Sequence, residues 1–135
     1  MIKKRYIQIS TPVTGEDEWI ALKEPLKNGW LTSGPKVREF EKSFAKRHKV
    51  KYAVAVTSAT SALHLAIVAL NIKAGDEVIV PAFTWVSTAN VVLYQGAKVI
   101  FCDINPRTFN IDPNELASKI NSKTKAIIAV HLFGL

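Results

Sequence analysis

The sequence has 135 residues, which is the length of one ordinary domain or of a piece of a larger one. Hydrophobic residues make up 48% and charged residues 21%, a balance that supports a folded core and excludes an intrinsically disordered chain. The single cysteine excludes an intramolecular disulfide framework and a zinc-ribbon site. The N-terminus lacks the apolar stretch of a signal peptide, and no apolar run is long enough to span a membrane. We therefore expect a soluble, cytoplasmic protein.

The net charge of +7 lies almost wholly in the first part of the chain. Residues 1–51 hold 12 Lys or Arg and 6 Asp or Glu, whereas residues 52–135 hold 6 and 5. The basic residues are densest at Lys46, Arg47, Lys49 and Lys51. A solvated helix end explains such a run better than a nucleic-acid surface, because no aromatic residues are interleaved with it. A small anionic ligand, such as a phosphate or a nucleotide sugar, fits the charge equally well.

Two helices are predicted at the start of the chain. The first covers about residues 15–28, with Thr14 as its cap, acidic residues in its first turn and Gly29 at its end. A loop, WLTSGP, follows at residues 30–35. Pro35 suits the first position of a second helix that runs to about His48.

From residue 52 the pattern changes to an alternation of strands and helices. Short apolar runs predict strands at 52–56, 78–81, 98–103 and 125–132. Helical segments are predicted between them at 58–71, 84–95 and 112–120, and the first of these is apolar nearly all round, so it should be buried. Strands that are apolar along their whole length are typical of a mostly parallel sheet covered on both faces, a three-layer α/β sandwich. Ligands bind such sheets at the carboxyl ends of the strands.

The segment TSAT, residues 57–60, lies where the first predicted strand meets the buried helix. Its small residues expose backbone N–H groups at the positive end of a helix, which suits a phosphate. Thr57, Ser58 and Thr60 can add hydroxyl donors, and Ala59 leaves room for an oxygen to approach the backbone. Taken alone, an ordinary helix cap is the simpler interpretation. The segment matches neither the dinucleotide fingerprint nor the P-loop.

The segment PAFTW, residues 81–85, places Phe83 and Trp85 just beyond the end of a strand. An aromatic ring at this position can stack on a flat heteroaromatic ligand. Taken alone, packing of both rings in the core is the simpler interpretation. Asp103, at the end of the third strand, can orient a ligand or cap the following turn, and the turn is favoured.

The histidines and the cysteine give weaker signals. His131, near the end of the last strand, can contact a ligand, although a core histidine among apolar neighbours is the commoner case. His64 lies in the middle of a predicted helix and is interpreted as a packing residue. His48 ends a basic helix and is interpreted as a surface residue. The three histidines are too scattered along the sequence to form a metal site. Cys102 lies inside a predicted buried strand and is interpreted as a small hydrophobic residue.

Four blocks in the same order give the chain a specific resemblance. They are WLTSGPKVREFEKSFA, AVAVTSATSALHLAIVAL, the run from GDEVIVPAFTWVSTAN to FCDINPRTFNID, and AIIAVHLFG. Together they resemble the N-terminal part of the DegT/DnrJ/EryC1/StrS family of sugar aminotransferases, which use pyridoxal 5'-phosphate (PLP). The resemblance runs without a gap from about residue 6 to the end.

The resemblance implies the large domain of a fold-type I PLP enzyme, normally a homodimer that transfers an amino group from glutamate to a keto-sugar nucleotide. It implies that Ser58, Ala59 and Thr60 bind the cofactor phosphate and that Trp85 stacks on the pyridine ring. Ala59 stands where the family often has glycine. The loop of Thr32, Ser33 and Gly34 corresponds to the mouth of the active site.

One departure from the family pattern is large. The Schiff-base lysine of the family, and the acid that pairs with the pyridine nitrogen, lie downstream of the segment that matches HLFG. No lysine here stands in the serine-rich context of the family's lysine. We therefore expect residues 1–35 to be a helical lead-in with the active-site loop, and residues 36–135 to be an incomplete PLP-binding domain that is inactive by itself.

Two alternatives stay open on the sequence alone. A PLP-dependent sugar dehydratase of the same family has histidine in place of the lysine, and it would share all of these segments. A non-enzymatic α/β module would instead bind nucleotide or nucleic acid through the basic N-terminal part. The resemblance points to polysaccharide, glycan or antibiotic-sugar pathways without ranking them.

Overall fold

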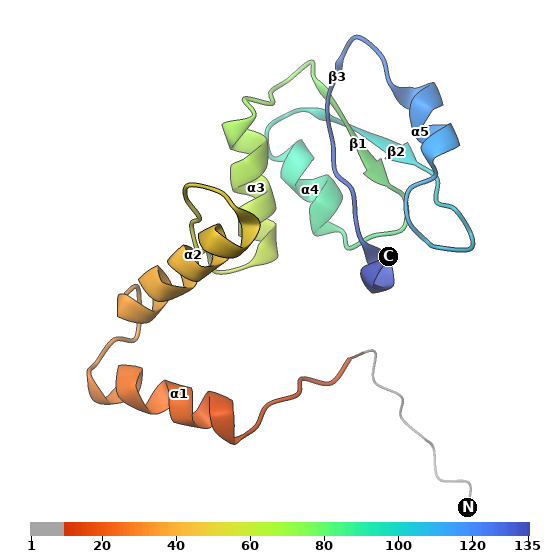
Figure 1. The fold of residues 1–135 in the computed structure, drawn as a ribbon. Coiled ribbons are helices and arrows are strands. Elements are labelled where there is room, and N and C mark those ends of the chain that lie inside the picture. Colours follow the sequence, from red (N-terminus) through yellow and green to blue (C-terminus); the bar gives the residue numbers. More distant parts are fainter. Residues whose placement is uncertain (1–9) are drawn as a thin grey trace, which may run out of the picture. The chain divides into compact units, whose positions relative to one another are not determined.

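A computed structural model describes residues 10–135, which form the two compact units drawn in Figure 1. The boundary between the units lies between Ala55 and Val56, and each unit is described by itself. The domain boundary predicted after residue 35 stays a prediction. Within the described residues, no helix is long and apolar enough to cross a membrane.

The first unit contains the two predicted helices, α1 (Glu16–Lys27) and α2 (Pro35–His48). The cap of α1 is Gly15 and not Thr14 as predicted, because the Glu18 carboxylate accepts the Gly15 backbone N–H at 2.7 Å. This bond satisfies an N–H at the helix start and lowers the pKa of Glu18. Helix α2 begins at Pro35 as predicted, since proline has no N–H to leave unsatisfied there.

The predicted strand at residues 52–56 is not formed. A strand needs a neighbour to pair its N–H and C=O groups, and no strand of the described residues pairs with this segment. The Ala55 N–H donates instead to the Glu41 carboxylate at 2.9 Å. Tyr52 and Val54 are exposed, in contrast to the side chains of a covered strand.

The second unit alternates helices and strands from α3 onward, as predicted. Its elements are α3 (Ala59–Ala69), β1 (Glu77–Pro81), α4 (Ser87–Leu93), β2 (Lys98–Cys102), α5 (Pro113–Lys119), β3 (Thr124–Ile127) and the 3-10 turn η1 (Leu132–Gly134). Helix α4 begins three residues later than predicted. The last strand ends at Ile127, five residues short of the predicted boundary. The start of α5 is confirmed, because the Asp112 carboxylate accepts the Asn114 N–H at 2.8 Å and Pro113 follows the cap.

The sheet is parallel, with β1 between β2 and β3. Ile79 on β1 aligns with Ile100 on one side and with Ile127 on the other. All five residues of β1 are buried, as expected for a parallel strand covered on both faces. The prediction of a mostly parallel α/β sheet is confirmed.

Side chains along β1 point alternately to the two faces of the sheet, and the residues that they contact show which helices cover each face. One face carries the core cluster, whose residues come from β1, α3, α4 and the turns beside them: Ile67, Ile72, Val78, Val80, Val91, Val92 and Ala97. The register places Ile79 and Cys102 on the other face. There the Cys102 thiol lies 3.9 Å from the backbone oxygen of Asp112, which caps α5. The unit therefore has three layers, with α3 and α4 on one side and α5 on the other.

Helix α3 is less buried than its apolar sequence predicted. Ile67 is buried in the core, whereas Leu65, Val68 and Leu70 are about half exposed. A single helix can bury only the stripe that meets its neighbours, and α3 packs mainly on α4.

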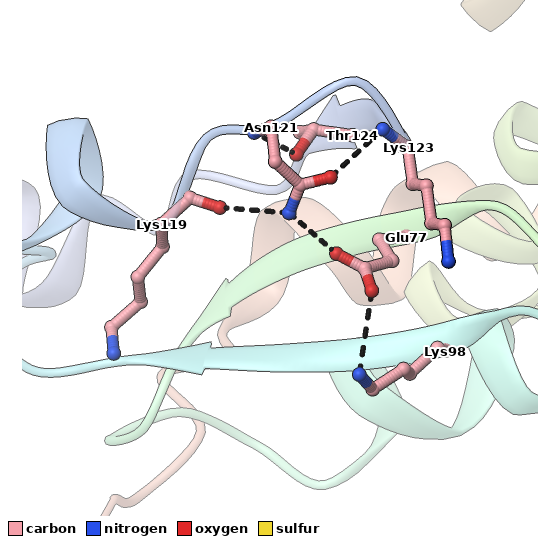
Figure 2. Close-up of polar contacts among 6 residues, drawn as sticks. All are labelled: Glu77, Lys98, Lys119, Asn121, Lys123 and Thr124. Carbon is pink, nitrogen blue, oxygen red and sulfur yellow. Dashed lines mark hydrogen bonds and ion pairs between the residues drawn. The ribbon is translucent and has the colours of Figure 1, made fainter.

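A polar network joins the starts of the three strands (Figure 2). The Glu77 carboxylate accepts the Asn121 amide at 2.8 Å and the Lys98 ammonium at 3.3 Å. The Asn121 side chain also accepts the backbone N–H of Lys123 at 2.8 Å. The hydrogen bond from the Asn121 amide is the largest of the interactions that lower the pKa of Glu77. The network thus holds β1, β2 and the turn before β3 together at their amino ends.

Candidate functional site

The carboxyl ends of the strands bring several predicted site segments to one edge of the second unit. Pro81 aligns with Cys102, and the Ala82 N–H donates to the Cys102 carbonyl at 2.8 Å, so the loops after β1 and β2 begin side by side. Helices α3 and α4 run alongside each other with their N-terminal ends toward this edge (Figure 1). The segments at 57–60, 82–86, 103–105 and 131–135 therefore gather there, as parallel topology predicts.

Ser58 is the N-cap of α3, as one interpretation of the TSAT segment predicted. Its hydroxyl accepts the Ser61 N–H at 3.1 Å and lies 3.0 Å from the Ser61 hydroxyl. The Thr57 hydroxyl is 3.5 Å from that same hydroxyl. Ser61 therefore links the predicted hydroxyls, although the sequence did not single it out. The sequence could have identified Ser61 from its position three residues after the serine that caps the helix.

Two backbone donors at the start of α3 remain available for a ligand. The first helical bond runs from the Ala62 N–H to the Ser58 carbonyl, and the Ser61 N–H is taken by the cap. Within residues 10–135, the N–H groups of Ala59 and Thr60 have no hydrogen-bond acceptor. Ala59 is exposed and Thr60 is partly exposed. Two free donors, a neighbouring hydroxyl and the positive helix end form a donor set that fits a phosphate.

The aromatic residues after β1 do not pack in the core, which was the simpler interpretation of the sequence. Trp85 is 77% exposed, and Phe83 is about half exposed against Phe109, at 5.8 Å between ring centroids. The loop between them is held to α4 by a 3.1 Å contact between the Thr84 and Thr88 hydroxyls. The Trp85 ring is therefore accessible to a flat ligand at the carboxyl edge.

Asp103 has the turn contact that the sequence favoured. Its carboxylate accepts the Ile104 N–H at 2.8 Å, and its carbonyl accepts the Asp112 N–H at 3.0 Å. The neighbouring Asn105 side chain accepts the Arg107 N–H at 2.9 Å, which continues the turn. The Asp103 side chain is exposed, so a second role toward a ligand stays a prediction.

His131 is exposed and not a core residue, contrary to the commoner interpretation. It caps η1, and its Nδ1 lies 3.0 Å from the Leu135 carbonyl. Asn110, which the sequence left within a loop, ties η1 to the loop after β2. Its side chain accepts the Leu132 N–H at 2.9 Å and donates to the Leu135 carbonyl at 3.3 Å. No local pattern identifies such a bridge, because its partners lie more than twenty residues away.

The remaining predictions for single side chains concern packing. Cys102 is fully buried, and burial raises the pKa of its thiol, so the prediction of a small hydrophobic residue is confirmed. His64 lies 2.8 Å from the Gln95 amide and edge-on to Tyr94, which confirms its packing role. His48 stacks on Phe44 at 4.3 Å on the surface of α2.

The loop of Thr32, Ser33 and Gly34 belongs to the first unit. A hollow of about 80 Å³ opens there, with Thr32 and Gly34 in its lining beside Trp30 and Lys36. Gly34 is buried because the Trp30 indole covers it, and a Cβ built on Gly34 would lie 2.9 Å from that ring. The loop is thus a shaped surface beside an aromatic ring. Its predicted place at an active-site mouth stays a prediction.

Comparison with known proteins gives a family match over nearly the whole chain. The sequence profile of the DegT/DnrJ/EryC1/StrS aminotransferase family matches residues 12–135. The spore coat polysaccharide biosynthesis protein SpsC of Bacillus subtilis (strain 168) is 45% identical over 136 aligned residues. The alignment covers 99% of this chain and 35% of SpsC, so the chain spans about a third of the length of this curated relative.

Solved structures give the same result for the fold. Spr1654 from Streptococcus pneumoniae, named as a sugar aminotransferase, superposes in its PLP form with a TM-score of 0.84 at 38% identity, over 93% of this chain and 32% of that one. NtdA from Bacillus subtilis, solved with bound pyridoxamine phosphate (PMP), superposes with a TM-score of 0.80 at 42% identity, over 88% and 27% of the two chains. These neighbours are fold-type I PLP aminotransferases, which confirms the predicted architecture.

Proposed function

Because the chain belongs to the DegT/DnrJ/EryC1/StrS aminotransferase family, whose members use PLP, we propose that it is part of an enzyme that transfers an amino group from glutamate to a keto-sugar nucleotide. The proposed pathway is polysaccharide or glycan biosynthesis, in line with the name of the relative SpsC. The proposed enzyme is a cytoplasmic homodimer. When bound, PLP supplies the electron sink that such a transfer requires.

The start of α3 is the observation that carries this proposal. In the proposed site, the free N–H groups of Ala59 and Thr60 donate to the cofactor phosphate, and the Ser58 and Thr60 hydroxyls lie beside it. The helix dipole adds a favourable interaction with the same dianion. The exposed ring of Trp85 covers one face of the pyridine.

The other predicted residues have supporting roles in the proposal. Thr32, Ser33 and Gly34, within the lead-in of residues 1–35, border the substrate entrance. Asp103 and His131 lie at the edge where a ligand would bind, on the PLP-binding domain of residues 36–135. Residues 1–135 contain no lysine in the family's serine-rich context, so we propose that they bind PLP without catalysing the transfer.

The test is equilibrium dialysis of the protein against PLP, with bound PLP measured by its own absorbance so that the readout does not depend on a tryptophan. The variant Trp85→Ala should weaken the affinity about fivefold, since an aromatic stack contributes on the order of 1 kcal/mol. Trp19→Ala, at another exposed tryptophan on α1, is the matched control and should leave the affinity unchanged. An unchanged dissociation constant in Trp85→Ala would refute the stacking role.

The phosphate end of the site is tested separately with Thr60→Val. This variant keeps the backbone N–H and the side-chain shape but removes the hydroxyl. Loss of one hydrogen bond to a charged group should weaken PLP binding about tenfold. If affinity is unchanged, the Thr60 hydroxyl does not contact the cofactor phosphate. The proposed inactivity is tested by incubating residues 1–135 with glutamate and PLP and measuring the keto acid that is formed. No keto acid above the level without protein is expected, and steady formation of keto acid would contradict the proposal.

A further inference from the structure

A second hollow in the first unit has no part in the proposed PLP site. It has a volume of about 220 Å³ and lies between α2 and the segment that follows it. Its lining consists of four residues of α2 and three residues of the returning chain: Arg38, Glu41, Lys42, Ala45, Lys51, Tyr52 and Ala53.

Local backbone geometry builds this hollow. Lys49 has a φ of 54°, in the left-handed region, and the Val50 N–H donates to the Ala45 carbonyl at 3.0 Å. These two features end α2 and turn the chain back along it. The Glu41 carboxylate then holds the Ala55 N–H at 2.9 Å, which fixes the returning segment beside the helix.

The charge in the hollow is unbalanced. Three cationic side chains, Arg38, Lys42 and Lys51, line it together with one carboxylate, that of Glu41. Oε1 of that carboxylate is already engaged by the backbone of Ala55. Within residues 10–135, none of the three cations forms an ion pair. Such a concentration of positive charge in one hollow favours the binding of an anion.

The positions of the cations suit a ligand with two phosphoryl groups. Arg38 and Lys42 are one helical turn apart and project from the same face of α2. A guanidinium can hold one phosphoryl group with two parallel hydrogen bonds, while ammonium groups act as point charges for another. The Lys51 ammonium lies 5.1 Å from the centre of the Tyr52 ring, so the ring already supports a cation.

We propose that this hollow binds a diphosphate group, either free or as part of a nucleotide. A single bounded hollow favours a small ligand over nucleic acid, because nucleic acid needs a row of cations along an extended track. The proposal does not depend on the proposed function, since the residues concerned are separate from those of the TSAT segment and from Trp85.

Calorimetric titration of the protein with inorganic pyrophosphate tests the proposal. We expect one saturable site whose affinity falls as salt is added. Lys42→Ala should weaken binding about threefold or more, and Arg38→Gln should weaken it further, since the bidentate contact is lost. Lys46→Ala is the matched control, because it removes the same charge from the same helix outside the hollow.

The outcomes divide clearly. If uridine diphosphate binds with the same dependence on Lys42 and Arg38, the ligand is a nucleotide, and if pyrophosphate alone binds, it is a free diphosphate. Both results support the proposal. Absence of saturable binding overturns it, and so does an equal effect of Lys46→Ala and Lys42→Ala, which would mean that net charge alone matters. If a single-stranded oligonucleotide binds more tightly than pyrophosphate, and if Lys42→Ala and Lys46→Ala weaken that binding equally, the surface binds nucleic acid and the proposal is overturned.

Discussion

Ile79 lies at the centre of β1, and replacing it with alanine tests whether this strand organises the second unit. The side chain is fully buried, and its register partner Ile127 on β3 is 42% exposed. The two residues therefore offer the same chemical change at aligned positions with different burial. Ile79→Ala removes three buried carbon groups, which gives about 2.4 kcal/mol from transfer alone and about 3–4 kcal/mol with the cavity term. Ile127→Ala should cost about 1 kcal/mol, because much of its surface already faces solvent.

Urea denaturation followed by circular dichroism measures both changes. A loss of 3–4 kcal/mol should move the midpoint by about 2 M with an unchanged slope, and Ile127→Ala should move it by well under 1 M. If Ile79→Ala does not fold, Ile79→Val provides the same test with an expected loss of about 1 kcal/mol. Equal costs for Ile79 and Ile127 would refute the assignment of β1 as the buried centre of the sheet.

Three further predictions follow from polar, thiol and backbone contacts. The Asn121 amide lowers the pKa of Glu77, so the stability from this carboxylate should be present above its unfolded pKa and be lost as the pH falls through the folded one. Urea midpoints should therefore drop in acid less steeply for Glu77→Gln, and parallel pH curves would contradict this. Cys102 should react with a thiol reagent only on unfolding, since burial raises its pKa and blocks access, so fast labelling of the native protein would count against the buried position. Gly34→Ala should destabilise the first unit by about 1–3 kcal/mol, because the new methyl group would overlap the Trp30 ring, and an unchanged thermal midpoint would show that the ring moves freely.

The starts of α2 and α5 could be predicted because their causes are local. Pro35 and the pair Asp112 and Pro113 each act within one turn of chain, and both helices begin at these residues. Strands β1 and β2 were also predicted, since each is a short apolar run between turns, but only β1 is buried along its whole length. The family was identified from four short blocks, and the comparisons confirm it over residues 12–135.

Apart from the cap of α1 and the start of α4, which are local, the errors concern contacts between distant parts of the chain. Residues 52–56 have the composition of a strand, but pairing needs a neighbour that a local pattern cannot supply. The same reason explains the half-exposed side chains of α3, since burial is decided by what packs on a helix and not by its own sequence. At the candidate site, the exposed position of Trp85 and the bridging role of Asn110 both depend on tertiary placement.

The network around Glu77 has a consequence for how this sheet can change in evolution. It fastens the three strands at their amino ends, through the Lys98 ammonium and the Asn121 amide. The loops at the opposite ends of the strands carry the candidate ligand contacts. The alignment of the strands is therefore set at their amino ends, whereas the candidate ligand contacts lie at their carboxyl ends. Substitutions in the loops after β1, β2 and β3 are therefore expected to change the ligand contacts while leaving the register of the strands unchanged.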